Sequence, residues 1–240
     1  MPLPKINTPT YELAIPSTGK KIRYRPFLVK EEKILIMALE SEDIKQITDA
    51  IVEILSECIL TKGVKVLELA TFDIEFIFLN VRAKSVGEMI DVNVTCPDDG
   101  KTQVQMEIDI DSIKVQKDKK HSNLVKIDEK LSMKMKYPSI QQFVQNNFDI
   151  KDTGPDVDQS LTMITTCIEQ IYTEEESWSA ADSTKDELKE FVEQMNTKQF
   201  KEIEGFFTTM PKLSHTVKVK NPKTKVESEV VLEGLASFFS

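Results

Sequence analysis

Residues 73–100, DIEFIFLNVRAKSVGEMIDVNVTCPDDG, decide the fold of this chain. The first half is apolar on nearly all sides, with four large apolar residues in a row at 76–79. A buried strand would also fit such a run, but its length, its basic end and Gly87 just beyond favour a core helix over 72–84. From 89 to 94 apolar and polar residues alternate, which is typical of a strand with one buried face. The stretch therefore predicts a helix followed closely by a strand.

Alternating segments around turn-forming residues predict β-hairpins. The strongest signal pairs 89–94 with 104–110 across the turn Pro97-Asp98-Asp99-Gly100. Further hairpins are predicted where 11–15 meets 22–24 and where 216–219 meets 226–232, and shorter strands are predicted at 124–127 and 133–135.

Helical periodicity predicts most of the remaining structure. The predicted helices span 29–41, 44–62, 140–148, 157–172, 186–195 and 197–207. In the second of these, Ile47, Ile51 and Ile54 mark one buried face, and Gly63 is placed to end the helix. Residues 174–183 are predicted to be a polar, acidic linker around the single tryptophan, Trp178.

These elements predict an α+β fold, with a helical core that carries two or more β-hairpins. We expect three segments along the chain. They are an N-terminal hairpin arm at 1–28, a helical core with central β-hairpins at 29–137, and a C-terminal helical region at 138–240 that ends in a hairpin and an apolar tail.

Composition and charge limit the classes of protein to which this chain can belong. With 40% apolar and 30% charged residues in 240, the chain is typical of soluble globular proteins. No apolar run reaches the ~18–20 residues that span a bilayer, and the N-terminus does not resemble a signal peptide, so we expect a cytoplasmic protein without a membrane partner. The net charge of -9 opposes nucleic-acid binding, which needs clustered Lys and Arg, and the short basic tract at 117–120 favours a solvated loop.

The three cysteines are far apart, which favours reduced thiols over a disulfide framework. Cys58 and Cys167 lie on apolar faces of predicted helices and are expected in the core. The turn that begins at Cys96 resembles one knuckle of a zinc ribbon, but Asp98 and Asp99 stand where a second cysteine would be. Zinc needs four soft or borderline ligands, so Cys96 is only a weak metal candidate, and we expect no metal and no cofactor.

The C-terminal hairpin repeats the layout of the central one. Val92 and Val217 open the two segments and Pro97 and Pro222 mark their turns, so each pair is separated by 125 positions. Asn221 occupies the place of the turn cysteine. Both hairpins thus resemble degenerate zinc-ribbon hairpins, and two origins stay open, a duplicated module or convergence of two similar hairpins.

No motif predicts catalysis. His121 and His215 are the only histidines, and neither lies near a nucleophile elbow. Residues 18–21 resemble the end of a phosphate-binding loop. Such a loop needs a glycine at position 14 and a helix after it, but this chain has Ala14 and a predicted strand. Paired carboxylates stay open, since 40 acidic residues make chance pairs common. We expect no catalytic residues, no small-molecule substrate and no enzyme.

Two apolar clusters are the candidate partner-binding residues: Phe206 and Phe207, and the tail residues Leu235, Phe238 and Phe239. Aromatic residues at a chain end need burial. Two alternatives stay open for the tail: a short final helix packed on its own domain, or an anchor inserted into a neighbouring subunit.

Four stretches carry a family resemblance: MPLPKINTPTY at 1–11, residues 16–41 with PFLVKEEKILIMALES, residues 73–96, and residues 210–239. They resemble the baseplate hub subunits and hub assembly proteins of large contractile-tailed bacteriophages of the myovirus type. The resemblance implies a structural or assembly protein that binds other baseplate hub and tape-measure proteins in the host cytoplasm. It leaves open whether the chain stays in the virion, in the tail baseplate, or leaves as a chaperone-like assembly factor.

Two alternatives from other classes are kept. A small tail-associated cell-wall hydrolase would show a concave pocket holding an Asp or Glu with raised pKa. A nucleic-acid-binding ribbon protein would show a basic stripe with exposed aromatic residues.

Overall fold

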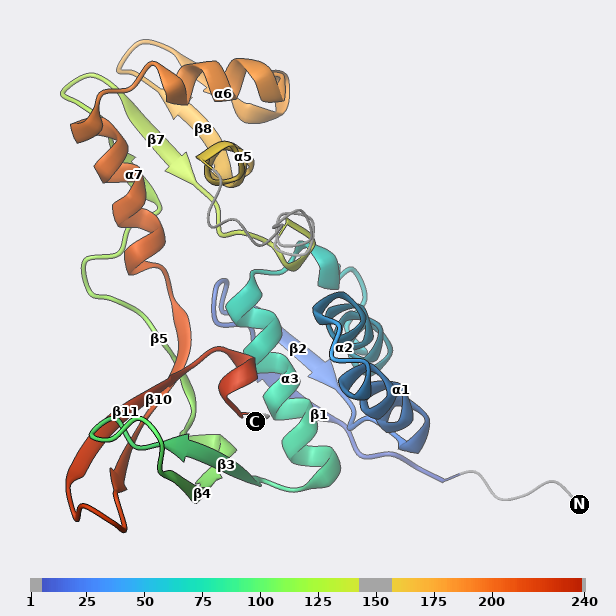
Figure 1. Cartoon of the computed structure of the whole chain (residues 1–240). Helices are drawn as coiled ribbons and strands as arrows, with labels where there is room; N and C mark the ends of the chain where they lie inside the picture. The colour runs from blue at the N-terminus through green and yellow to red at the C-terminus, as the bar shows by residue number, and fades with distance from the viewer. Residues whose placement is uncertain (1–5, 143–156, 239–240) are drawn as a thin grey trace, which may run out of the picture. The chain divides into compact units, whose positions relative to one another are not determined.

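The computed structural model describes residues 6–142 and 157–238 (Figure 1). The chain forms two compact units, the first from Met1–Gln116 with Lys212–Ser240 and the second from Lys117–Pro211. The units are divided differently from the three predicted segments, because strand β10 (Lys212–Lys220) pairs with β5 (Lys114–Gln116) and so returns the chain to the first unit.

Unit 1 combines helices with short antiparallel strands. In chain order its elements are β1 (Tyr11–Ala14), β2 (Lys21–Tyr24), α1 (Val29–Glu40), α2 (Ile44–Cys58), η1 (Val66–Glu68), α3 (Thr71–Val86), β3 (Met89–Thr95), β4 (Gln103–Asp109), η2 (Ile110–Ser112), β5, β10, β11 (Glu227–Glu233) and η4 (Leu235–Phe238). Among the described residues of this unit the sheets are β1-β2, β3-β4 and β11-β10-β5. The α+β class and the three predicted hairpins of this unit are therefore confirmed.

The predicted core helix is α3. Eight of its residues are buried, from Phe72 to Ala83, so burial on most sides explains the nearly continuous apolar run. The helix ends at Gly87, whose φ of 137° favours glycine and whose amide donates to the Ala83 carbonyl. The choice of helix over strand for this run is confirmed.

The prediction that α2 extends to residue 62 was wrong. The helix ends at Cys58, and Ile59 turns to an extended conformation with ψ 115°. Ile59 forms a β-bridge with Tyr24, and the amide of Leu60 donates to the Arg23 carbonyl at 2.8 Å. Backbone hydrogen bonds to the edge of β2 thus replace a last helical turn, which periodicity alone does not reveal.

The core of unit 1 joins α3 to both long hairpins. Leu79 from α3, Val92 from β3 and Val217 from β10 are buried in one cluster, and Phe238 from η4 completes it. The inward residues of each strand alternate with exposed polar ones, as half-buried antiparallel strands require. The core therefore depends on segments from both ends of the unit's sequence.

Unit 2 is a four-stranded antiparallel sheet with helices packed against it. Its strands are β6 (Leu124–Lys126), β7 (Ser132–Met135), β8 (Ile168–Tyr172) and β9 (Ser177–Ser179), in that order, and its other elements are α5 (Val157–Cys167), η3 (Ala180–Asp182), α6 (Lys185–Glu193) and α7 (Thr197–Thr209). The two short strands predicted around 128–130 are confirmed, and so are the last two helices. Capping boxes begin both helices, Thr184 with Glu187 and Asn196 with Gln199.

Two predictions in unit 2 were wrong. The predicted helix 157–172 ends at Cys167, and 168–172 forms strand β8, which pairs with β7 on one side and β9 on the other. Ile168 and Ile171 are buried in these pairings, so tertiary pairing overrides a plausible helical pattern. The predicted linker 174–183 contains β9 and η3, and Trp178 pairs with Ile171. The helix predicted at 140–148 begins at Ile140, and its part beyond 142 lies outside the described residues.

Within the part of the chain that the structure describes, no helix is long and apolar enough to cross a membrane.

Candidate interaction site

The predicted tail residues lie inside unit 1. Phe238 is only 1% exposed and packs in the core cluster, and Leu235 packs against the same cluster. The amide of Leu235 donates to Oε1 of Glu75 on α3 at 3.1 Å. Phe239 lies outside the described residues. This placement corresponds to the alternative of a final helix packed on its own domain, and partner binding by the tail stays a prediction.

The other predicted pair lies in the core of unit 2. Phe206 is 2% exposed, and its ring lies 5.8 Å from that of Tyr137 and 5.2 Å from that of His121. Phe207 contacts Phe206 edge to face at 5.2 Å and is partly buried. Aromatic stacking of this kind stabilises a core. A role of either residue in binding a partner stays a prediction.

His121 lies in this aromatic cluster with polar partners on both ring nitrogens. Its Nδ1 is 3.0 Å from the Thr209 hydroxyl and its Nε2 is 3.0 Å from the Tyr137 hydroxyl. Burial lowers the pKa of His121, and nearby Lys117 lowers it further, so the neutral ring is favoured at pH 7. The Thr209 hydroxyl itself donates to the Gly205 carbonyl, which ties it to α7 rather than freeing it as a nucleophile.

Unit 2 has an open groove, and the hydrolase alternative can be tested by asking which carboxyl groups line it. Its volume is about 460 Å³, and it is lined by Leu124, Lys134, Gln170, Tyr172 and the turn 173–177. The carboxyl groups whose pKa is raised by burial, Asp73 and Glu75, belong to unit 1 and do not line it. This groove therefore does not show the arrangement that the hydrolase alternative requires.

The three cysteines are buried thiols. Burial raises the pKa of Cys58 and of Cys167 to about 11, and it raises the pKa of Cys96, with Asp98 and Asp99 adding to the effect. Protonated thiols are poor metal ligands. Among the described residues, no three His, Cys, Asp or Glu side chains gather in a way that could hold a metal ion.

A strong chelator is expected to leave the melting temperature of the purified protein unchanged. Cys96 is the one soft ligand in the central turn, and the opposite turn supplies Asn221 instead of a thiol. The measurement is thermal unfolding before and after chelation, together with elemental analysis. One zinc ion per chain, lost together with the folded state, would overturn this expectation.

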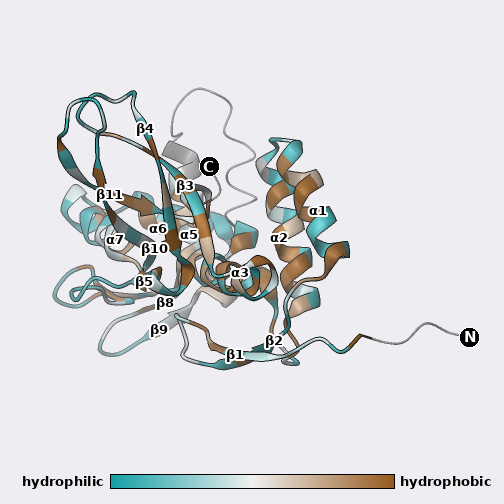
Figure 2. Ribbon diagram, turned by 90° about the horizontal axis from the view of Figure 1, so that it is seen from below, coloured by the Kyte–Doolittle hydropathy of each residue, from teal (hydrophilic) through white to brown (hydrophobic). Residues whose placement is uncertain are grey.

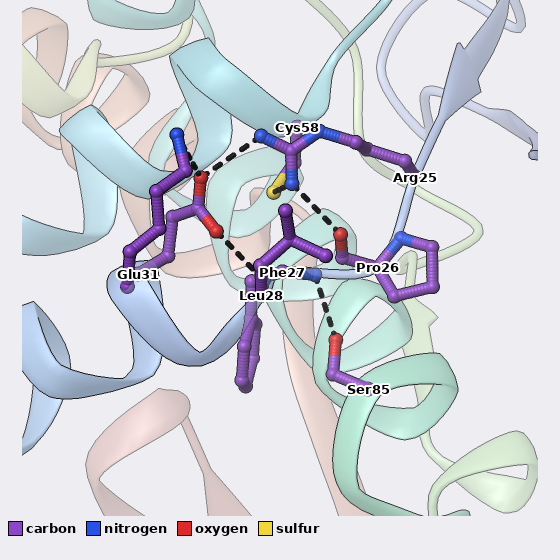
Figure 3. A network of polar contacts seen from close by, with 8 residues as sticks. Arg25, Pro26, Phe27, Leu28, Glu31, Cys58 and Ser85 are labelled. Atoms are coloured by element: carbon purple, nitrogen blue, oxygen red, sulfur yellow. Dashed lines mark hydrogen bonds and ion pairs between the residues drawn. The ribbon is translucent and has the colours of Figure 1, made fainter. Parts of the chain in front are cut away.

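A polar network fixes the start of α1 (Figure 3). Oε1 of Glu31 accepts a hydrogen bond from Nη2 of Arg25 at 2.9 Å and lies 3.1 Å from Nζ of Lys30, while Oε2 accepts from the Leu28 amide at 2.7 Å. Nη1 of Arg25 donates to the Pro26 carbonyl at 2.9 Å. The Glu31 side chain is 3% exposed, so a buried carboxylate holds the residues that enter the helix.

The same network reaches the neighbouring helices. Nη1 of Arg25 lies 3.7 Å from Sγ of Cys58 at the end of α2, and the amide of Phe27 donates to Oγ of Ser85 on α3 at 2.9 Å. Burial alone would raise the pKa of Glu31, but hydrogen bonds from Arg25, Leu28 and Lys30 lower it to about 2. The carboxylate is therefore charged at neutral pH. The network to which it belongs joins the start of α1 to α2 and α3.

α1 carries apolar side chains on both sides. Glu31, Leu35 and Ala38 face inward, and α1 packs against α2. Five large apolar residues at its start and on its outer side are exposed: Leu28, Val29, Ile36, Met37 and Leu39, with Val29 at 80% and Met37 at 60%. Figure 2 shows hydrophobic and hydrophilic residues alternating along this helix. We call these five residues the α1 outer face.

The α1 outer face is the candidate interaction site. Single exposed apolar residues are normal on protein surfaces, but five within twelve positions form a cluster, which commonly marks a binding surface. The sequence prediction did not include these residues. The signal was present in ILIM at 34–37, because four consecutive apolar residues point around the whole circumference of a helix, and a helix covered on one side leaves some of them exposed.

Comparison with known proteins gives one match. The family model described as T4 bacteriophage base plate protein matches residues 8–240. No curated protein matches this chain, and no solved structure does. Because the family model covers nearly the whole chain, including both units and the α1 outer face, this chain belongs to the T4 bacteriophage base plate protein family.

Proposed function

We propose that this chain is a structural or assembly protein of the baseplate hub, and that it acts by binding other proteins rather than by catalysis. Membership in the base plate family supports a structural role in the phage tail. The hub assignment rests on the resemblance of 1–11, 16–41, 73–96 and 210–239 to hub proteins. The observation that carries the binding role is the exposed apolar cluster of the α1 outer face.

The α1 outer face has properties that a binding surface needs. Burial of a large apolar side chain contributes about 1.5–3 kcal/mol, so two or three such residues can provide most of the affinity of an interface, after the costs of association. The network of Arg25 and Glu31 and the packing of α1 on α2 hold the helix in place before binding. Glu32, Lys33 and Glu40 lie among the apolar residues and supply a polar rim.

The partners we propose are other hub proteins and the tape-measure protein, met in the host cytoplasm while the tail forms. The net charge of -9 favours protein partners over nucleic acid. We propose no small-molecule substrate and no membrane partner. Whether the chain stays in the baseplate is answered by mass spectrometry of purified virions.

The double substitution Ile36→Gln and Met37→Gln is expected to weaken partner binding at least about tenfold, because the lost apolar burial exceeds 1.4 kcal/mol. Glutamine is a good helix former, so α1 and the melting temperature should be retained. The measurement is co-purification of the chain with the other baseplate proteins expressed together, followed by titration against each protein that is captured.

The matched control replaces two apolar residues of similar exposure elsewhere, Leu67→Gln and Leu124→Gln, at 48% and 56% exposed. This control should bind like the wild type. Retained binding in the Ile36 and Met37 variant would reject the α1 outer face as the interface. Capture of no baseplate protein by the wild-type chain would reject the proposed function itself.

A further inference from the structure

The turns of the two long hairpins of unit 1 begin with the same backbone conformation. In the central turn the amide of Gly100 donates to the Cys96 carbonyl at 3.0 Å, and in the C-terminal turn the amide of Lys225 donates to the Asn221 carbonyl at 2.9 Å. Gly100 has φ 63° and Lys225 has φ 66°, both left-handed. Left-handed backbone is uncommon for lysine, so its recurrence at the matching position is informative. The 125-residue offset seen in the sequence therefore extends to the backbone of 96–100 and 221–225. Beyond these residues the turns differ, because the Cys96 amide donates to the Thr102 carbonyl and the Asn221 amide to the Val226 carbonyl.

The two turns also contact each other. Oδ1 and Oδ2 of Asp98 accept hydrogen bonds from Nδ2 of Asn221 at 3.0 and 3.1 Å, and Oδ2 accepts another from the Thr224 hydroxyl. These bonds join residues more than 120 positions apart in sequence. Cys96 and Asn221 are each 1% exposed. One exposed carboxylate thus connects the two hairpins, next to the buried side chains of Cys96 and Asn221.

We propose that Asp98 joins the central and C-terminal hairpins where, in a zinc ribbon, a metal ion would join them, and we call this contact the clasp. Positions 96, 99, 221 and 224 then form a latent zinc site, which means a site that would bind zinc if all four positions carried cysteine. Paired turns that bind zinc supply ligands from the first and fourth residues of each turn. Here those positions hold Cys96 and Asp99 in one turn and Asn221 and Thr224 in the other. In the wild type, the side chains of Asp99, Asn221 and Thr224 form hydrogen bonds in place of metal–ligand bonds.

The surrounding bonds explain why the wild-type set is a clasp and not a metal site. Asp99 is held by its own turn, accepting from the amides of Lys101 at 3.0 Å and Thr102 at 2.9 Å and from the Thr102 hydroxyl at 2.6 Å. Oδ1 of Asn221 accepts from the Lys223 amide at 2.8 Å, which leaves its Nδ2 for Asp98.

A gain of metal binding tests the latent site. The triple variant Asp99→Cys, Asn221→Cys and Thr224→Cys keeps Cys96 and is titrated with Co²⁺ alone and Zn²⁺ alone. We expect one ion per chain, the absorption bands of tetrahedral Co²⁺–thiolate coordination, and a melting temperature raised by at least about 5 °C with zinc. Adding Cys96→Ala should abolish the four-thiolate spectrum, and the wild type should bind neither ion.

Each other outcome of this titration counts against the proposal. A folded triple variant that binds no ion, or binds Co²⁺ in a six-coordinate form, would overturn it. If the metal-free triple variant is unfolded, it is refolded with zinc, because structural zinc sites supply folding free energy. Recovery of the native circular dichroism then supports the latent site, and failure to refold with zinc overturns it.

The clasp itself is tested by Asp98→Ala. Its loss leaves Asn221 and Thr224 without their carboxylate partner, so we expect a melting temperature lower by at least about 3 °C and faster amide hydrogen exchange at 221–226. The matched control is Asp91→Ala, on the exposed side of β3. Unchanged melting temperature and exchange in Asp98→Ala would show that the hairpins do not depend on the clasp.

Discussion

Replacing Phe238 with alanine is expected to lower the free energy of unfolding of unit 1 by about 3–5 kcal/mol. The side chain is 1% exposed and packs in the cluster formed by α3, the central hairpin and β10. Its removal leaves a cavity where three parts of the sequence meet, and such a core relaxes only partly. The measurement is urea unfolding of the wild type and Phe238→Ala, monitored by circular dichroism.

Ser237→Ala is the matched control, since its hydroxyl donates to the Glu233 carbonyl at the surface and no large side chain is lost. Partner binding measured on the same variants separates the two alternatives for the tail. Loss of stability with binding per folded molecule unchanged supports a tail packed on its own unit. Unchanged stability with binding at least about tenfold weaker would instead favour the anchor and contradict the stability prediction.

Glu31→Gln is expected to destabilise unit 1 by about 3 kcal/mol at pH 7. Glutamine keeps the size of the side chain but removes the charge, so the largely buried guanidinium of Arg25 loses its ion partner. The loss should appear in urea unfolding. Glu32→Gln, its neighbour in the first helical turn, is the control and should change little.

The effect of Glu31→Gln should depend on pH. Because the pKa of Glu31 is lowered from 4.5 to about 2 in the folded chain, its stabilising contribution is full above pH 4.5 and is lost as the pH falls toward 2. The stability difference between wild type and variant should shrink over that window. Burial raises the pKa of Glu75 to about 7, so its contribution to stability falls as the pH rises. This contribution is the same in wild type and variant and cancels in the stability difference. A difference that stays constant from pH 6 to pH 3 would contradict the assignment.

Local patterns in the sequence were enough for the elements whose pairing is local. The hairpins at Met89–Thr95 and Gln103–Asp109 and at Tyr11–Ala14 and Lys21–Tyr24 follow from a two-residue alternation on either side of a turn. α3 follows from its length and from Gly87 at its end. The sequence also contained the 125-residue offset between the two turns, since side-chain types and prolines repeat there.

The candidate interaction site was not predicted from the sequence. The sequence placed Leu235 and Phe238 beside the apolar end of the chain, but it does not show whether such residues find a core. The outer face of α1 was missed, since assigning Ile36 and Met37 to the surface requires knowing that Leu35 and Ala38 face α2. Helical periodicity describes which residues share a face and not which face is covered.

By itself the sequence determined the α+β class, the local hairpins and the apolar helix at the centre of unit 1. The tertiary structure alone decided that Ile168–Tyr172 is a strand, that α2 stops at Cys58, and that Asp98 meets Asn221. Each of these depends on a partner far away in the chain, whose hydrogen bonds or buried area outweigh local preferences of less than about 1 kcal/mol per residue. Local preferences depend on neighbouring residues and can be read from the sequence, whereas a contact with a distant residue forms only when the chain folds.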